Sequence, residues 1–124
     1  MAADYDISID QGASFSMFLT LKDQAGEKID ITEYTFRGKI KKDFNDNNDQ
    51  AVFSFNILNQ FNEQTKGMVE VYLSSQDTAS IHTNVRGTSR NVVKMIYDIE
   101  SESPLGFVTR WIQGLAFISP EVTK

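Results

Sequence analysis

The oxygen-rich segment from Asp43 to Asp49 (DFNDNND) comes nearest to a metal site in residue types and spacing. Asp and Asn at alternate positions are the arrangement with which calcium-binding loops supply oxygen ligands. However, Asn48 stands where an EF-hand loop needs its turn glycine, and Ser54 stands where that loop needs its bidentate glutamate. The favoured interpretation is therefore a solvated hairpin loop without a metal ion.

Other candidates for catalysis are few. His82 is the only histidine and cysteine is absent, so a zinc site or a histidine acid–base pair would lack its usual partners. Glu100 and Glu102 share one face of a predicted strand, as two glycosidase carboxylates would. Such a pair needs a cleft between carboxylates roughly 5–9.5 Å apart, which a small domain rarely builds. We therefore predict no enzyme activity, no cofactor and no small-molecule substrate, with His82 at the surface or near a helix cap.

A row of basic residues follows one face of a predicted strand and continues just beyond it: Arg37, Lys39, Lys41 and Lys42. The favoured interpretation is a solvated or salt-bridged sheet face, with Glu70 or Glu100 as cross-strand partners. Docking to an acidic partner is the alternative. The chain as a whole carries a formal net charge of −5, which opposes general binding to nucleic acid.

Alternation of apolar and polar residues with a period of two dominates the sequence and predicts β-strands. About seven strands are expected, covering residues 7–9, 15–21, 34–40, 53–57, 69–73, 93–99 and 105–118. This spacing indicates an all-β, two-sheet antiparallel β-sandwich, immunoglobulin-like in shape, in a single domain over residues 1–124. Ser74 and Asp77 predict one short capped helix that bridges the two sheets.

Two further features bear on location and packing. The apolar runs are far shorter than the ~18 residues that span a bilayer, and the first residues lack a signal peptide's pattern. We therefore expect no membrane association and synthesis in a cytoplasm. Gly38 replaces a side chain in an inward-facing row, which predicts close approach of a bulky residue, with Trp111 as the expected occupant.

The final predicted strand is unusual because large apolar residues occupy both of its faces. One explanation is a β-bulge at Gly114 that switches which positions face the core. The other is burial of the second face against another subunit, and the two are compatible. If a partner covers this face, the candidate interface residues are Phe107, Arg110, Trp111, Leu115 and Phe117.

Pieces at both ends of the sequence resemble the amino-terminal β-sandwich domain of phage baseplate upper proteins, a tail and baseplate structural family of tailed bacteriophages. At the start these pieces are Asp10–Gly12, Phe15, Lys22–Glu27 and Ile29–Thr32. At the end they are Tyr97–Glu100, Val108–Arg110, Gly114 and Ser119–Thr123. The middle of the chain matches the family only in strand spacing.

The resemblance implies a virion structural protein of the tail, baseplate or fibre-attachment region, assembled in the host cytoplasm. Its partners would be other virion proteins and further copies of itself. Longer relatives continue into a fibre or receptor-binding part, whereas this sequence stops at Lys124, so we expect an adaptor or plug. The alternative is a carbohydrate-binding β-sandwich adhesion module that stacks sugars on exposed aromatic residues, with Tyr5, Phe44, Tyr72 and Trp111 as candidates.

Overall fold

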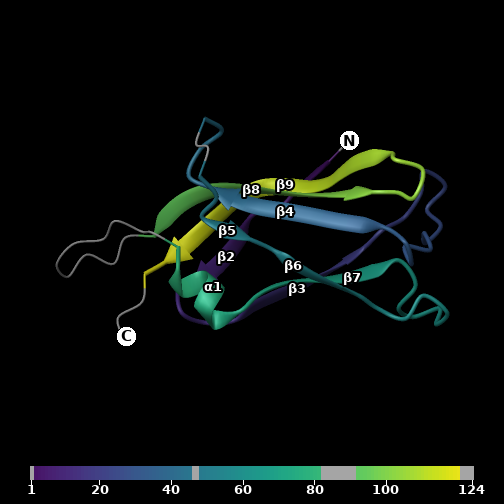
Figure 1. The fold of residues 1–124 in the computed structure, drawn as a ribbon, viewed down its shortest axis with the longest axis horizontal. Coiled ribbons are helices and arrows are strands. Elements are labelled where there is room, and N and C mark those ends of the chain that lie inside the picture. The colour runs from purple at the N-terminus through teal and green to yellow at the C-terminus, as the bar shows by residue number, and fades with distance from the viewer. Residues whose placement is uncertain (1, 46–47, 82–91, 121–124) are drawn as a thin grey trace.

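The computed structural model describes residues 2–45, 48–81 and 92–120, which form two β-sheets packed face to face (Figure 1). The large sheet has the order β1-β9-β8-β4-β5, with β2 also paired to β9, and the small sheet has the order β3-β7-β6. The elements are β1 (Ala3–Asp4), β2 (Ile7–Asp10), β3 (Phe15–Thr20), β4 (Thr35–Lys41), β5 (Ala51–Val52), β6 (Ser54–Ile57), β7 (Met68–Leu73), α1 (Ser75–Ala79), β8 (Val93–Glu102) and β9 (Val108–Ser119). The predicted all-β, two-sheet sandwich is confirmed.

The strand pairing differs from the sequence prediction in two places. The described strands pair in antiparallel fashion except at the amino terminus, where β1 and β2 run parallel to β9. The strand predicted over residues 53–57 corresponds to β6 in the small sheet, and the prediction missed β5, which comes just before Phe53 and joins the large sheet. Both differences arise from contacts between distant segments, which the period of two does not report.

Two clusters of buried apolar side chains fill the space between the sheets. The larger cluster draws on both sheets and includes Ile9, Ile40, Val71, Met95 and Ile118. The second cluster consists of Leu21, Ile31 and Val69, with Trp111 among the partly buried residues packed against it. Each fully buried Ile or Leu contributes on the order of 1.5–3 kcal/mol, so the inward-facing residues supply the main stabilisation.

The helix α1 connects the two sheets and begins as predicted. The Ser74 hydroxyl accepts a hydrogen bond from the Asp77 N–H, and the Asp77 carboxylate accepts one from the Ser74 N–H, both at 3.1 Å. This capping box is confirmed. The buried Thr78 hydroxyl donates to the carbonyl of Ala13 at 2.8 Å and accepts from the N–H of Gly12 at 3.0 Å. The helix is thereby fixed to the turn between β2 and β3.

Gly38 does make room for a bulky residue, but the predicted occupant is wrong. A Cβ at Gly38 would lie 2.9 Å from Cγ1 of Ile99 and 3.2 Å from Cδ2 of Phe53. The Phe53 ring fills this space because the chain crosses between the sheets at that residue. Trp111 packs elsewhere, against the second cluster.

The register of β8 and β9 locates the irregularity in the last strand. Ile99 lies opposite Ile112, whereas the next residue, Glu100, lies opposite Arg110. Trp111 is therefore the extra residue of a β-bulge, which lets it lie on the core side together with Ile112. The predicted bulge exists, but its predicted position at Gly114 is wrong.

Gly114 serves a different purpose, because the segment between β1 and β2 crosses it closely. A Cβ at Gly114 would lie 2.2 Å from the carbonyl oxygen of Tyr5. The same carbonyl accepts a 2.5 Å hydrogen bond from the hydroxyl of Tyr97, and the Asp6 carboxylate accepts a 3.0 Å bond from the N–H of Leu115. The glycine thus allows the amino-terminal segment to close this border of the large sheet.

Gly114→Ala is expected to lower the free energy of unfolding by about 2–3 kcal/mol, because the methyl group would overlap backbone atoms of Tyr5. Gly26→Ala is the control: its φ of +83° makes alanine unfavourable, but nothing lies within 4 Å. Urea unfolding measures the stability of both variants, and amide hydrogen exchange shows which part of the structure each substitution loosens. Exchange at Leu115 should accelerate in Gly114→Ala alone, and equal protection in the two variants would contradict this account.

Burial raises the pKa of Tyr97 above its ordinary value of 10.0, and the Asp6 carboxylate adds to this effect. Because the pKa is higher in the folded than in the unfolded state, this contribution to stability is complete below pH 10.0 and declines as the pH rises further. Tyr97→Phe should cost about 0.5–1.5 kcal/mol at neutral pH, and the difference from wild type should shrink above pH 10.0. Urea unfolding across this range measures it; a constant difference would contradict it.

Candidate functional site

The predicted basic row lies along the outer face of the large sheet, where Arg37 and Lys39 are paired with carboxylates. Arg37 forms ion pairs with both Glu100 and Glu102, which raise the pKa of its guanidinium. Lys39 pairs with Asp49 at 3.1 Å. The expected partner Glu100 is confirmed, whereas Glu70 lies on β7 of the other sheet and the pairing predicted for it is wrong.

These ion pairs also bear on the carboxylate pair considered for glycoside cleavage. Glu100 and Glu102 both accept from the same guanidinium, on an open sheet face. Their geometry is that of exposed cross-strand salt bridges, which contribute little stability and hold a charged surface in place.

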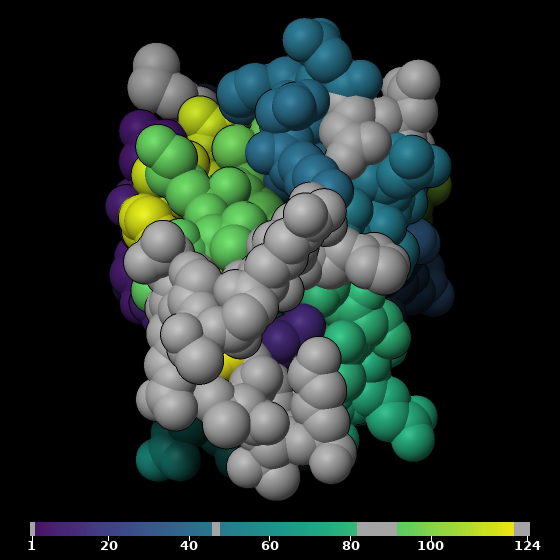
Figure 2. Space-filling view, turned by 90° about the vertical axis from the view of Figure 1, so that its left-hand side faces the viewer, coloured from purple at the N-terminus to yellow at the C-terminus, as the bar shows by residue number. Residues whose placement is uncertain are grey.

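A shallow hollow of about 620 Å³ occupies the outer face of the large sheet over β8 and β9. Ile96 and Leu115, which lie opposite each other, form part of its lining. Acidic and basic groups border it together: Asp4, Asp6, Asp98, Lys39, Lys41 and Arg110. Because both signs of charge are present, the hollow selects neither an anion nor a cation. The exposed Phe44 also borders it, from the β4–β5 connection, whose described residues lie at the top of the view in Figure 2.

The predicted interface residues do not share one surface. Leu115 and Phe117 are half-buried on the outer face of β9, where Arg110 pairs with Asp98 at 3.4 Å. Trp111 instead packs against the second cluster, and its indole N–H donates to the buried Ser101 hydroxyl at 2.7 Å. The bulge is the reason for this separation, since it turns Trp111 away from its odd-numbered neighbours.

Phe107 belongs to a third surface, the tip of the β8–β9 hairpin, together with residues that sequence reasoning missed. Leu105 is 86% exposed, Phe107 is 71% exposed and Val108 is 50% exposed. The turn is nevertheless ordered: the Ser103 N–H donates to the Phe107 carbonyl at 2.9 Å, and the Ser103 hydroxyl accepts from the Phe107 N–H at 3.1 Å. The signal that could have identified this tip is a turn that carries large apolar residues instead of polar ones.

The hairpin tip lies at the end of the sandwich opposite α1 (Figure 1). A groove of about 430 Å³ runs beside it, lined by Ile29, Tyr34, Ser103, Pro104, Leu105, Phe107, Thr109 and Trp111. Tip and groove together form one contiguous, mostly apolar surface, which we call the hairpin-tip surface. Exposed apolar patches occur at protein–protein contacts, at membrane contacts and in ligand-binding grooves.

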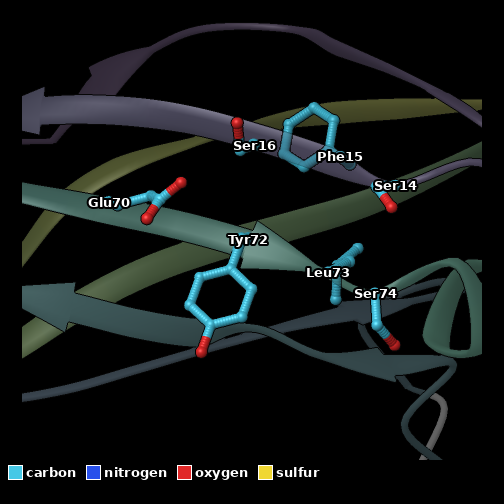
Figure 3. A pocket seen from close by; sticks show the side chains of 7 residues that line it. All are labelled: Ser14, Phe15, Ser16, Glu70, Tyr72, Leu73 and Ser74. Atoms are coloured by element: carbon cyan, nitrogen blue, oxygen red, sulfur yellow. The ribbon is translucent and has the colours of Figure 1, made fainter.

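The outer face of the small sheet carries a pair of exposed aromatic residues. Phe18 is 54% exposed on β3 and Tyr72 is 38% exposed on β7. Because Phe18 lies opposite Glu70, Tyr72 is its diagonal neighbour on the same face. A shallow hollow of about 330 Å³ beside Tyr72 is lined by hydroxyl groups and the Glu70 carboxylate (Figure 3). Of the predicted sugar platform, Tyr5, Phe44 and Tyr72 are exposed, whereas Trp111 is engaged with the core.

The predicted oxygen-rich loop and the single histidine lie partly outside the structure. Asp46, Asn47 and His82 are outside the described residues. Within residues 2–45, 48–81 and 92–120, no three side chains of His, Cys, Asp or Glu form a group that could hold a metal ion. No helix in these ranges is both long enough and apolar enough to cross a membrane.

Comparison with known proteins adds no relative: the sequence matches no protein-family model and shows no significant similarity to a curated protein. The choice of a candidate site therefore rests on geometry. The hairpin-tip surface is the strongest candidate, because its large apolar residues are exposed and an ordered turn holds them in place.

Two variants distinguish the core role of Trp111 from the exposed surface at the hairpin tip. Trp111→Phe should lower the free energy of unfolding by about 1–3 kcal/mol, because the buried Ser101 hydroxyl loses its donor. The double substitution Leu105→Ser and Phe107→Ser should stay within about 0.5 kcal/mol of wild type. Urea unfolding monitored by circular dichroism measures both, because Trp111→Phe removes the single tryptophan of the chain. A comparable loss in the two variants would mean that the tip belongs to the core.

Proposed function

We propose that this protein is a structural subunit of a phage virion, in the tail, baseplate or fibre-attachment region, and that it acts by protein–protein assembly without catalysis. The hairpin-tip surface is the observation that carries the proposal. Its exposed Leu105 and Phe107 are held by an ordered turn, as a contact surface for a neighbouring subunit requires. The resemblance of both chain ends to phage baseplate domains supports the same conclusion.

The energetics favour a partner for this surface. Burial of a large apolar side chain contributes about 1.5–3 kcal/mol, and Leu105 and Phe107 retain most of that contribution unused in the isolated chain. An ordered turn loses little conformational entropy on docking, which leaves more of the burial energy for affinity. In this proposal the partners are other virion proteins and further copies of the chain, assembled in the host cytoplasm into the virion tail.

The second candidate function is carbohydrate binding by an adhesion module. The observation that favours it is the exposed pair Phe18 and Tyr72. Tyr72 lies beside the Glu70 carboxylate and the serine hydroxyls (Figure 3). An aromatic face with flanking hydrogen-bonding groups suits the ring of a sugar. This candidate ranks second because Trp111, the largest aromatic side chain, is not available as a platform.

The test is to search for the chain in density-gradient-purified particles of the phage whose genome encodes it, by mass spectrometry and by immunogold labelling. We expect detection in intact particles with label on the tail. Leu105→Ser with Phe107→Ser should reduce incorporation by at least about tenfold, through lost burial at the interface. Phe44→Ser, which removes an even more exposed phenylalanine elsewhere, is the control and should be incorporated normally.

Absence of the chain from purified particles would overturn the virion proposal. If the absent chain also bound bacterial cell-surface polysaccharide, and Tyr72→Ala abolished that binding, the carbohydrate-binding alternative would replace it.

A further inference from the structure

The strand β3 forms a border of the small sheet that the described part of the chain leaves open. It pairs with β7 along its whole length, from Phe15 opposite Leu73 to Thr20 opposite Met68. Within the described ranges, no strand pairs with its other side. Figure 1 shows β3 along the lower side of the sandwich, below the large sheet. A strand in this position presents unpaired N–H and C=O groups at its free edge.

The hydrogen-bond pattern identifies which residues face that free edge. The Leu21 N–H donates to the carbonyl of Gly67 at 2.8 Å, so the odd-numbered residues of this strand point toward β7. On β7, the carbonyl of Met68 accepts a hydrogen bond from the N–H of Leu58. The backbone groups of the even-numbered residues of β7 therefore point toward β6, and those of the odd-numbered residues point toward β3. Because antiparallel strands alternate in this way, the backbone groups of Ser16, Phe18 and Thr20 point outward from β3.

This edge lacks the features with which proteins protect an open strand. Residues 14–21 contain no charged residue, no proline and no glycine. The other borders of the two sheets are shorter or carry charge: β6 has four residues, β5 has two, β1 contains Asp4 and β2 contains Asp10. A long, uncharged and apolar edge favours pairing with another strand.

The inward-facing side chains of β3 are also incompletely covered. Phe15, Met17 and Leu19 are half-buried, whereas Val69, Val71 and Leu73, their partners on β7, are fully buried. A further strand beside β3 would cover these three side chains and extend the larger core cluster, against which they already pack.

We infer that this edge pairs with the same edge of a second copy of the chain, antiparallel and across a twofold axis. Centring the axis on Met17 pairs residues 14–20 over their full length, with Ser16 opposite Phe18 of the second copy. The outward-pointing backbone groups then meet in hydrogen-bonded pairs, and Phe15 lies opposite Leu19 on the core side. The two small sheets become one continuous sheet of six strands.

A second copy fits this edge better than a charged partner strand does. Each chain has a net charge of −5, so two copies repel each other overall, and only an uncharged contact surface avoids adding like-charge contacts to that repulsion. Residues 14–21 are such a surface. The inference concerns a different part of the molecule from the hairpin-tip surface and does not depend on the virion proposal.

The test is sedimentation equilibrium of the full chain across a range of concentrations. Wild type should show a reversible dimer of the 14.0 kDa chain. Ser16→Pro should raise the dissociation constant at least about tenfold, because proline removes an outward N–H without breaking the β7 ladder. Ser16→Ala keeps that N–H and should dimerise like wild type, while circular dichroism should show that both variants remain folded.

Introduced cysteines report the register, since the chain has no cysteine of its own. Met17→Cys lies opposite itself at the proposed axis and should give a disulfide-linked dimer under mild oxidation. Phe15→Cys and Leu19→Cys should each cross-link poorly alone and readily when the two variants are mixed. If Phe15→Cys and Leu19→Cys cross-linked best alone, the proposed register would be wrong.

Two results would overturn the inference. One is a wild-type chain that stays monomeric at every concentration, which would leave the edge to an extended segment of another protein. The other is a wild-type dimer that Ser16→Pro leaves intact, which would place the contact between copies at another surface.

Discussion

The extra residue at Trp111 determines how the last strand divides its side chains between core and surface. Because strand side chains alternate with a period of two, a strand without the bulge would face Arg110 inward and Trp111 outward. The bulge reverses this assignment, so Trp111 donates to Ser101 inside and Arg110 pairs with Asp98 outside. The β8–β9 hairpin is the centre of the large sheet, with β4 on one side and β1 and β2 on the other. One residue therefore decides which side chains of the hairpin are exposed.

How much of the structure could be predicted depends on the distance over which each contact acts. The Ser74–Asp77 capping box spans three residues and was readable from the sequence, as was the alternation of core residues along each strand. The alternation also showed that β9 was irregular. It did not show where the irregularity lies. The glycine at position 114 suggested a bulge there, but it is required by the close approach of Tyr5, which is more than one hundred residues away in the sequence. The exposed hairpin tip was only partly foreseen, because the alternation placed Leu105 at the start of the last strand, whereas the structure places it in the turn before β9.

The border strands of the two sheets differ in the residues that protect them from pairing with other strands. At the border of the large sheet the amino-terminal segment carries three carboxylates, and one of them, Asp6, replaces a backbone acceptor for Leu115. Aspartate at an edge disfavours pairing with another strand, because it brings charge and competes for backbone hydrogen bonds. At β3 the sequence supplies serine, threonine and apolar residues in the corresponding positions. Residues that protect against unwanted pairing are therefore present at one border and absent from the other, as expected of an edge that pairs with another strand.

The geometry of the two proposed contacts makes them complementary. The carboxyl end of β3 leads to Leu21, which packs in the same cluster as Ile29 and Trp111 beside the hairpin tip. If two copies pair antiparallel through β3, their hairpin tips must point to opposite ends of the dimer. Two tips on one rigid sheet would bind more tightly together than either does alone when their targets are spaced to match. Such a dimer would suit a connector between repeated neighbours, since its reach is set by the strands themselves and not by a flexible linker.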